Sequence, residues 1–289
     1  MGGGLMQLVA YGAQDIYLTG NPQITFFKVV YRRHTNFAME AIVQTFEGTP
    51  RDGGKVSATI ARNGDLVHRV YLEVEGEIGA DEPSHKASNL LEEVELEIGG
   101  QLIDRHCGKW MDIWVELTHD SAKKAQYENM VGGTTKSWMP LQFSFCRNPG
   151  LAIPLIALQY HEVKLNMRFN KVGDANVCLY CDYIYLDTDE RRRFAQTSHE
   201  YLIEQTQSSK SNAIAATCAN KVPLHFNHPV KELVWCFDGV TGVAAAKVLL
   251  RLNGHERFSA RCGAYFSRVQ RYQHHTGAKE AFGDELQMY

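Results

Sequence analysis

Long apolar runs and an excess of basic residues are both missing from this sequence. No stretch of about 18 consecutive apolar residues occurs, so we expect no transmembrane helix. The formal net charge is -3, from 30 Lys and Arg against 33 Asp and Glu. Proteins that wrap a nucleic acid usually carry a clear basic excess. We therefore expect no direct nucleic-acid partner.

The motifs of common enzyme and repeat classes are missing too. The chain contains no GxSxG elbow, no P-loop and no HExxH motif. It shows no repeat with a period of about 20–50 residues, which argues against solenoids and propellers. Asn-x-Ser/Thr acceptors are also absent, so glycosylation through them is not expected. We predict no enzyme, no catalytic residue, no cofactor and no metal site.

The seven cysteines form no recognisable framework. Their number is odd and they lie in apolar or β-like stretches, which favours reduced thiols in a cytosolic compartment. Cys178 and Cys181 have a zinc-like spacing, but no second CxxC pair is present. Their segment is strand-like, which would direct the two sulfurs to opposite faces. We interpret both as packing residues.

Alternating apolar residues dominate the chain from 26 to 188. At 65–75, Val70, Leu72 and Val74 alternate with polar residues, which predicts a half-buried strand. Residues 93–98 alternate in the same way and end at Gly99-Gly100, a turn pair typical of a hairpin. Strands are further expected at 26–31, 38–46, 55–61, 141–146, 152–158, 162–169 and 177–186.

One helical island interrupts these strands. Trp110, Ile113, Trp114 and Leu117 have helical spacing, and helix-forming residues continue to Met130 before Gly132-Gly133 stops the helix. Apolar residues then vanish at 187–193, where we place a domain boundary. Beyond it, strands are expected at 201–206, 213–217, 221–227, 231–237, 247–252 and 264–272.

Many short strands with frequent turns predict an all-β sandwich or barrel. The first block has about eight strands with one helical insertion, which fits an eight-stranded jelly roll. The second block has about six strands before the sequence stops.

Three long motifs occur in order and span nearly the whole chain. The first covers Leu5–Asp15 and continues through Tyr17–Gly20 and Asn21–Phe27 to Val30–Phe37. The second is Phe145–Val163, and the third is Tyr183–Ala195. Together they resemble the major capsid proteins of nucleocytoplasmic large DNA viruses, in which the third motif corresponds to the junction between two jelly rolls.

The resemblance implies a double jelly roll whose two eight-stranded sandwiches stand side by side. It implies an N-terminal arm at 1–25, a first jelly roll at 26–188 and a partial second jelly roll at 189–289 that lacks C-terminal strands. Three copies would form a pseudo-hexameric capsomer of an icosahedral shell. Neighbouring capsomers, minor capsid proteins and a penton protein would be partners, and an inner viral membrane would be near. The expected location is the virion capsid, assembled in the host cytoplasm.

Other chemistry-bearing residues have simpler interpretations. The acidic run Glu92, Glu93, Glu95 and Glu97 is interpreted as a solvated strand face rather than a glycosidase pair. The basic clusters are interpreted as inter-subunit or inter-domain ion pairs, and the tryptophans as core or contact-patch residues. These residues are Arg32, Arg33, Arg191, Arg192 and Arg193, and Trp110, Trp114 and Trp138; His225, His228, His274 and His275 are expected in turns or interfaces.

Two hypotheses remain open. Residues 2–20 could reach under neighbouring subunits or toward a membrane or minor capsid protein, so their deletion should impair shell assembly while leaving trimers intact. The alternative function is a minor capsid, fibre or spike-type jelly roll that binds carbohydrate or a receptor. That alternative predicts an exposed groove lined with aromatic residues.

Overall fold

The computed structural model describes residues 35–76, 89–133, 135–209, 212–214, 219–240, 242–277 and 282–289. The chain divides into two compact units, Met1–Asn36 and Phe37–Tyr289. The predicted arm, the strand at 26–31 and the Arg32-Arg33 cluster lie outside the described residues. All elements described below belong to the second unit.

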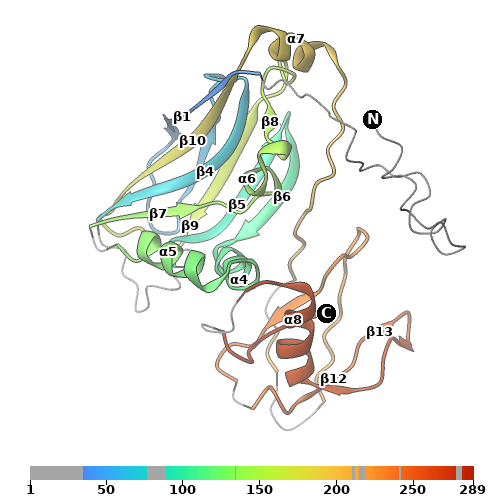
Figure 1. Ribbon diagram of the computed structural model, residues 1–289. Coiled ribbons are helices and arrows are strands. Elements are labelled where there is room, and N and C mark those ends of the chain that lie inside the picture. Colours follow the sequence, from blue (N-terminus) through green and yellow to red (C-terminus); the bar gives the residue numbers. More distant parts are fainter. Residues whose placement is uncertain are drawn as a thin grey trace, which may run out of the picture. The chain divides into compact units, whose positions relative to one another are not determined.

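Two five-stranded antiparallel sheets form a sandwich over the first half of this unit (Figure 1). One sheet has the order β1 (Phe37–Gln44), β10 (Asn176–Leu186), β4 (Leu66–Glu75) and β7 (Lys136–Pro140), with β8 (Ile153–Pro154) also beside β4. The other has the order β2 (Phe46–Glu47), β3 (Lys55–Thr59), β9 (Val163–Phe169), β5 (Leu91–Ile98) and β6 (Gln101–Cys107).

The strand order is that of a jelly roll. Leaving aside β2 and β8, which have two residues each, the first, eighth, third and sixth strands along the chain form one sheet. The second, seventh, fourth and fifth form the other. The prediction of an all-β jelly roll with a helical insertion is confirmed for this region.

The alternating strands bury one face against the opposite sheet. Val70, Leu72 and Val74 of β4 are buried as predicted, and Leu165 and Met167 of β9 are buried from the other sheet. Each buried aliphatic side chain contributes about 1.5–3 kcal/mol to folding. The largest core cluster therefore extends between the two sheets and holds them together.

The predicted hairpin is also confirmed. Gly99 and Gly100 join β5 to β6 with φ angles of 60° and 81°. A two-residue turn with two positive φ angles matches the twist of the strands, and glycine adopts such angles without steric cost. This turn sets the register in which Ile98 faces Gln101.

The helical island consists of two helices rather than one. The helix α4 (Gly108–Thr118) ends where His119 becomes extended, and α5 (Ser121–Val131) begins after Asp120. The Asp120 side chain accepts a hydrogen bond from the backbone N–H of Lys123, which caps the second helix. The predicted stop is correct, because α5 ends directly before Gly132.

Two predictions for the first block were wrong in part. The strand expected at 141–146 is instead a stretch after β7 followed by the short helix α6 (Ser144–Arg147). Phe143 and Phe145 are buried there, so the aromatic content reflects core packing and not a strand. The strand expected at 152–158 shortens to β8, preceded by the 3₁₀ turn η2 (Pro149–Leu151).

The region after β10 differs from the predicted pattern of six strands. It begins with the helix α7 (Thr188–Gln196) at the charged segment. Its described strands form three two-stranded antiparallel sheets. These pair β11 (Val234–Cys236) with β16 (Leu286–Met288), β12 (Lys247–Val248) with β15 (Arg261–Cys262), and β13 (Arg251–Leu252) with β14 (His255–Glu256).

The strand expected at 264–272 is helical. A π-helical turn η3 (Tyr265–Val269) leads into α8 (Gln270–His274), and Phe266 and Gln270, four residues apart, are both buried. The expected strands at 201–206 and 221–227 have no sheet partner among the described residues. None of the helices in the described ranges is long and apolar enough to cross a membrane.

Candidate functional site

The acidic face of β5 lies where the sequence predicted it. Glu93, Glu95 and Glu97 share one half-exposed face, while Val94 and Leu96 are buried on the other. Arg105 of β6 pairs with Glu93 at 2.7 Å and with Glu95 at 2.5 Å. Arg105 therefore forms ion pairs with Glu93 and Glu95, as expected for a solvated strand face.

The predicted cysteine and histidine positions do not come together. Cys181 is buried and Cys178 is partly exposed, as expected for opposite strand faces. Within the described ranges, no group of three His, Cys, Asp or Glu side chains could hold a metal ion. Burial raises the pKa of the Cys146 thiol to about 12, so this sulfur stays protonated and unreactive at neutral pH.

Three of the histidines singled out in the sequence lie on the surface, and one forms an ion pair. His225, His228 and His274 are exposed, whereas His275 is partly buried. His275 directly follows α8, and its Nε2 lies 2.8 Å from Oε1 of Glu232. This contact lies within the second half of the chain.

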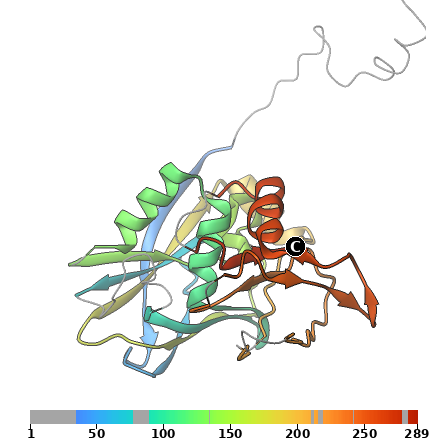
Figure 2. The same ribbon diagram turned by 90° about the horizontal axis from the view of Figure 1, so that it is seen from below.

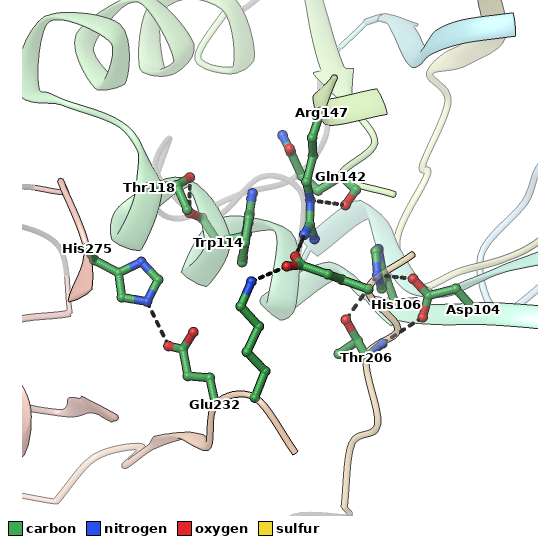
Figure 3. A network of polar contacts seen from close by, with 11 residues as sticks. Asp104, His106, Trp114, Thr118, Gln142, Arg147, Thr206, Glu232 and His275 are labelled. Atoms are coloured by element: carbon green, nitrogen blue, oxygen red, sulfur yellow. Dashed lines mark hydrogen bonds and ion pairs between the residues drawn. The ribbon is translucent and has the colours of Figure 1, made fainter. Parts of the chain in front are cut away.

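A polar network joins the sandwich to the extended residues 197–209, here called the connector (Figure 3). Asp104 and His106 of β6 are buried, and His106 Nε2 lies 2.9 Å from Asp104 Oδ2. Asp104 Oδ1 accepts the backbone N–H of Thr206 at 2.9 Å, and the Thr206 hydroxyl lies 3.2 Å from His106 Nε2. The carboxylate thus fixes the connector beside β6.

A second part of the network centres on Arg147 of α6. Its guanidinium lies 3.6 Å from the centre of the Trp114 ring and 3.0 Å from Glu204 of the connector. Lys231 donates to the same Glu204 carboxylate. This hydrogen bond lowers the pKa of Glu204, so the carboxylate stays charged near neutral pH. Trp114 therefore stacks against the Arg147 guanidinium within the chain.

A buried charge cluster links α4, α5 and α8. Glu116 of α4 is 2% exposed and lies 2.5 Å from Lys124 and 2.7 Å from Arg271. Arg271 also donates to the backbone carbonyl of Glu116 at 2.8 Å, so α8 lies beside α4 (Figure 2). Removing one partner of such a buried group is costly because the remaining charges lose compensation.

The charged segment at 187–193 also pairs within the sandwich. Arg191 Nε lies 3.0 Å from Oδ1 of Asp65, and Arg191 Nη2 lies 3.1 Å from Oδ2. The same carboxylate accepts the backbone N–H of Leu186 at 2.8 Å. Arg191 is therefore an intramolecular anchor of α7, while Arg192 and Arg193 remain exposed.

The other tryptophans lie in different places. Trp110 packs against the small cluster that contains Ile113 and Leu117. Trp138 lies on the outer face of β7 and its Nε1 donates to Glu73 at 2.7 Å. One is therefore a packing residue, and the other belongs to a sheet face.

The alternative function predicts a groove lined with several aromatic residues. A surface cavity of about 380 Å³ has a single aromatic side chain in its lining. Tyr160 is its one aromatic lining residue and is 93% exposed. The Arg62 guanidinium beside it donates to the carbonyls of Leu158 and Gln159. Its other lining residues are Thr59, Ile60, Ala61 and Glu162.

The network residues escaped sequence analysis for a simple reason. Asp104, Glu116 and Arg271 belong to no motif, and Arg147 lies in the motif Phe145–Val163 without a pattern that indicates its partners. One sequence signal could have indicated buried polar contacts, namely a charged residue at a position that the pattern assigns to the core. Asp104 in β6 and Glu116 in α4 are such residues.

Comparison with known proteins identifies the family. Residues 25–187 match the model of the major capsid protein N-terminus, and residues 190–245 match the model of the large eukaryotic DNA virus major capsid protein. A quasi-atomic model of the PBCV-1 virus capsid is similar to this chain with a TM-score of 0.77 and 35% identity. It covers 92% of this chain and 80% of that one.

Curated relatives agree. The major capsid protein of Pyramimonas orientalis virus is 54% identical over 95% of this chain and 76% of its own length. That of Paramecium bursaria Chlorella virus 1 is 42% identical over 94% of this chain and 78% of its own. For the Phaeocystis pouchetii virus protein, at 45% identity, the chain spans 58% of the relative's length. The chain belongs to the major capsid protein family of large eukaryotic DNA viruses.

Proposed function

We propose that this chain is a structural subunit of an icosahedral large-DNA-virus shell and that three copies form a pseudo-hexameric capsomer. The observation that carries the proposal is the jelly-roll sandwich together with the family match over residues 25–187. The relatives are structural capsid proteins, so the role is mechanical and not enzymatic. Rigid blocks with repeated weak contacts close such a shell.

The internal design supports a rigid building block. Arg147, Glu204 and Lys231 hold the connector, and Glu116 joins α4 to α8. A subunit whose parts are fixed loses less conformational entropy when it joins a shell. The proposed division is an arm at 1–25, a first jelly roll at 26–188 and a partial second jelly roll at 189–289.

The proposed partners follow from this role. They are two further copies in a homotrimer, neighbouring capsomers, minor capsid proteins and a penton protein, with an inner viral membrane nearby. Direct nucleic-acid contact is not proposed, since the net charge is -3. The proposed location is the virion capsid, with assembly in the host cytoplasm.

Native mass spectrometry of protein released gently from purified particles tests the proposal. A dominant species near three times the chain mass of 32.6 kDa would support a capsomer made of this chain. A minor monomeric species beside a different dominant shell protein would contradict it and favour an accessory role.

A further inference from the structure

The four sheet edges of the sandwich differ in how they are protected. β2, at one edge, has two residues. β7, at another, has five residues and carries Lys136 and Pro140, which disfavour pairing with a further strand. The third edge, β6, is covered by the connector, because Gln205 donates to the carbonyl of Ile103 and Thr206 donates to Asp104.

The fourth edge, β1, has none of these protections within the part of the chain that the structure describes. It has eight residues, Phe-Ala-Met-Glu-Ala-Ile-Val-Gln, with no Lys, Arg or Pro. Its register with β10 runs from Phe37 to Gln44 without a bulge. Within the described residues β1 pairs with β10 alone. A long, flat, apolar edge of this kind binds other chains unless a specific partner covers it.

The side chains of β1 are exposed as well as its backbone. Phe37 is 68% exposed, Met39 50% and Val43 53%. These three alternate residues share the outer sheet face with Tyr180, which lies opposite Val43 in the register. The Tyr180 ring stacks on Tyr71 at 5.3 Å. The edge therefore continues into a pair of stacked aromatic rings, a residue type that is enriched at protein interfaces.

We propose that β1 is a docking edge for a second copy of this chain, which lays extended backbone along the free edge and covers Phe37, Met39 and Val43. The inference rests on the proposed function. Alternate residues of an eight-residue edge expose about eight backbone N–H and C=O groups, near the roughly ten hydrogen bonds of an ordinary interface.

Stoichiometry and charge favour a second copy over other partners. Every subunit of the shell presents this edge, so its partner must be equally abundant, and the chain itself meets that condition. β1 itself carries the exposed Glu40 and no basic residue, and the adjoining face carries Arg69 directly opposite Asp182. A surface without basic excess attracts neither a nucleic acid nor an anionic membrane.

The first test replaces Met39 or Val43 by lysine in the full chain and measures association by native mass spectrometry across a concentration series. Leu102→Lys is the matched control, because Leu102 is 52% exposed on the edge strand that the connector covers. We expect Met39→Lys and Val43→Lys each to raise the dissociation constant of the oligomer at least about tenfold, because lysine would be buried in the contact. Leu102→Lys should leave it unchanged. Circular dichroism melts that match the wild type would exclude misfolding.

The second test places single cysteines at the same positions. After treatment with a short bismaleimide, Met39→Cys should give cross-linked dimers above the background of the native thiols, and Leu102→Cys should not. Association of both lysine variants at wild-type strength overturns the docking edge while leaving the capsomer proposal intact. A cross-link from position 39 to a residue of 1–36 in the same chain also overturns it. A wild-type chain that stays monomeric at all concentrations contradicts the proposed function itself and the docking edge with it.

Discussion

The sandwich and the region after it are stabilised in different ways. Every member of the largest core cluster lies between Val56 and Tyr183, so the sandwich packs on its own side chains. The later region buries Phe282, Leu286 and Met288 in a small cluster that also contains Ile113 and Leu117 of α4. Its described two-stranded sheets need such support, because isolated strand pairs are marginally stable. The helical insertion is therefore part of the packing of both regions.

Charge shows the same contrast. Pairs on the sandwich surface, such as Arg168 with Glu92, are about half exposed. At the contact between α4 and α8, Glu116 and Arg271 are 2% and 3% exposed. Surface pairs contribute little to stability, whereas breaking a buried pair is costly. The contact between the two regions should therefore be sensitive to single charge changes that the sandwich surface tolerates.

The largest expected effect is in the sandwich core. Leu72→Ala should lower the free energy of unfolding by about 3–5 kcal/mol, because Leu72 is fully buried and the change leaves a cavity. Leu252→Ala in the later region should cost less than about 0.5 kcal/mol, because Leu252 is 53% exposed. Urea unfolding followed by circular dichroism measures both. Similar losses would show that the two regions do not differ as described.

A somewhat smaller effect is expected at the buried charge cluster. Glu116→Gln removes the carboxylate that Lys124 and Arg271 share and should cost about 3 kcal/mol. The loss should appear first as faster proteolysis after residue 188, because α8 loses its ion pair to α4. Glu92→Gln, at a half-exposed pair, is the control and should change stability by less than about 0.5 kcal/mol. Equal proteolysis of both variants would contradict the role assigned to Glu116.

The sequence predicted the elements whose pattern is local. The alternation of β4 and the glycines after β5 determine strand and turn without help from distant residues. Errors arose where burial by distant residues overrides local preference. Phe145 and Phe266 are aromatic residues in β-like stretches, yet both lie in helical turns because the core covers them there.

The contact network was less predictable than the fold. Arg191 was correctly interpreted as an ion-pairing residue, but its partner Asp65 lies in a loop that no pattern connects to it. Cys181 and Cys178 were assigned to opposite faces from strand periodicity alone. Pairs such as Glu116 with Arg271 arise from the folded arrangement, because 155 positions separate the two residues.

A modest effect is expected at the cap of α5, the helix that carries Lys124. Asp120→Ala removes the acceptor for the Lys123 N–H, at 2.8 Å, and should lower the free energy of unfolding by about 1 kcal/mol. Asp120→Asn retains an acceptor and should restore most of this loss. Urea midpoints of the two variants give the comparison; indistinguishable midpoints would mean that the cap does not stabilise the insertion.

The smallest effect concerns the connector and depends on pH. Lys231 lowers the pKa of Glu204 from its ordinary value of 4.5, so Glu204 stabilises the fold above that pH. The contribution is lost as the pH falls through the lower native pKa, because the protonated carboxyl no longer pairs with Lys231 and Arg147. Glu204 is 46% exposed, so Glu204→Gln should cost less than about 1 kcal/mol at pH 7, and the difference from wild type should vanish in strong acid.

Urea midpoints, followed by the fluorescence of Trp114 beside Arg147, measure the stability difference between Glu204→Gln and wild type at each pH. Glu200→Gln on the same connector is the control, since Glu200 forms no ion pair with any described residue. A difference between Glu204→Gln and wild type that persists unchanged at low pH would assign the effect to packing and not to charge.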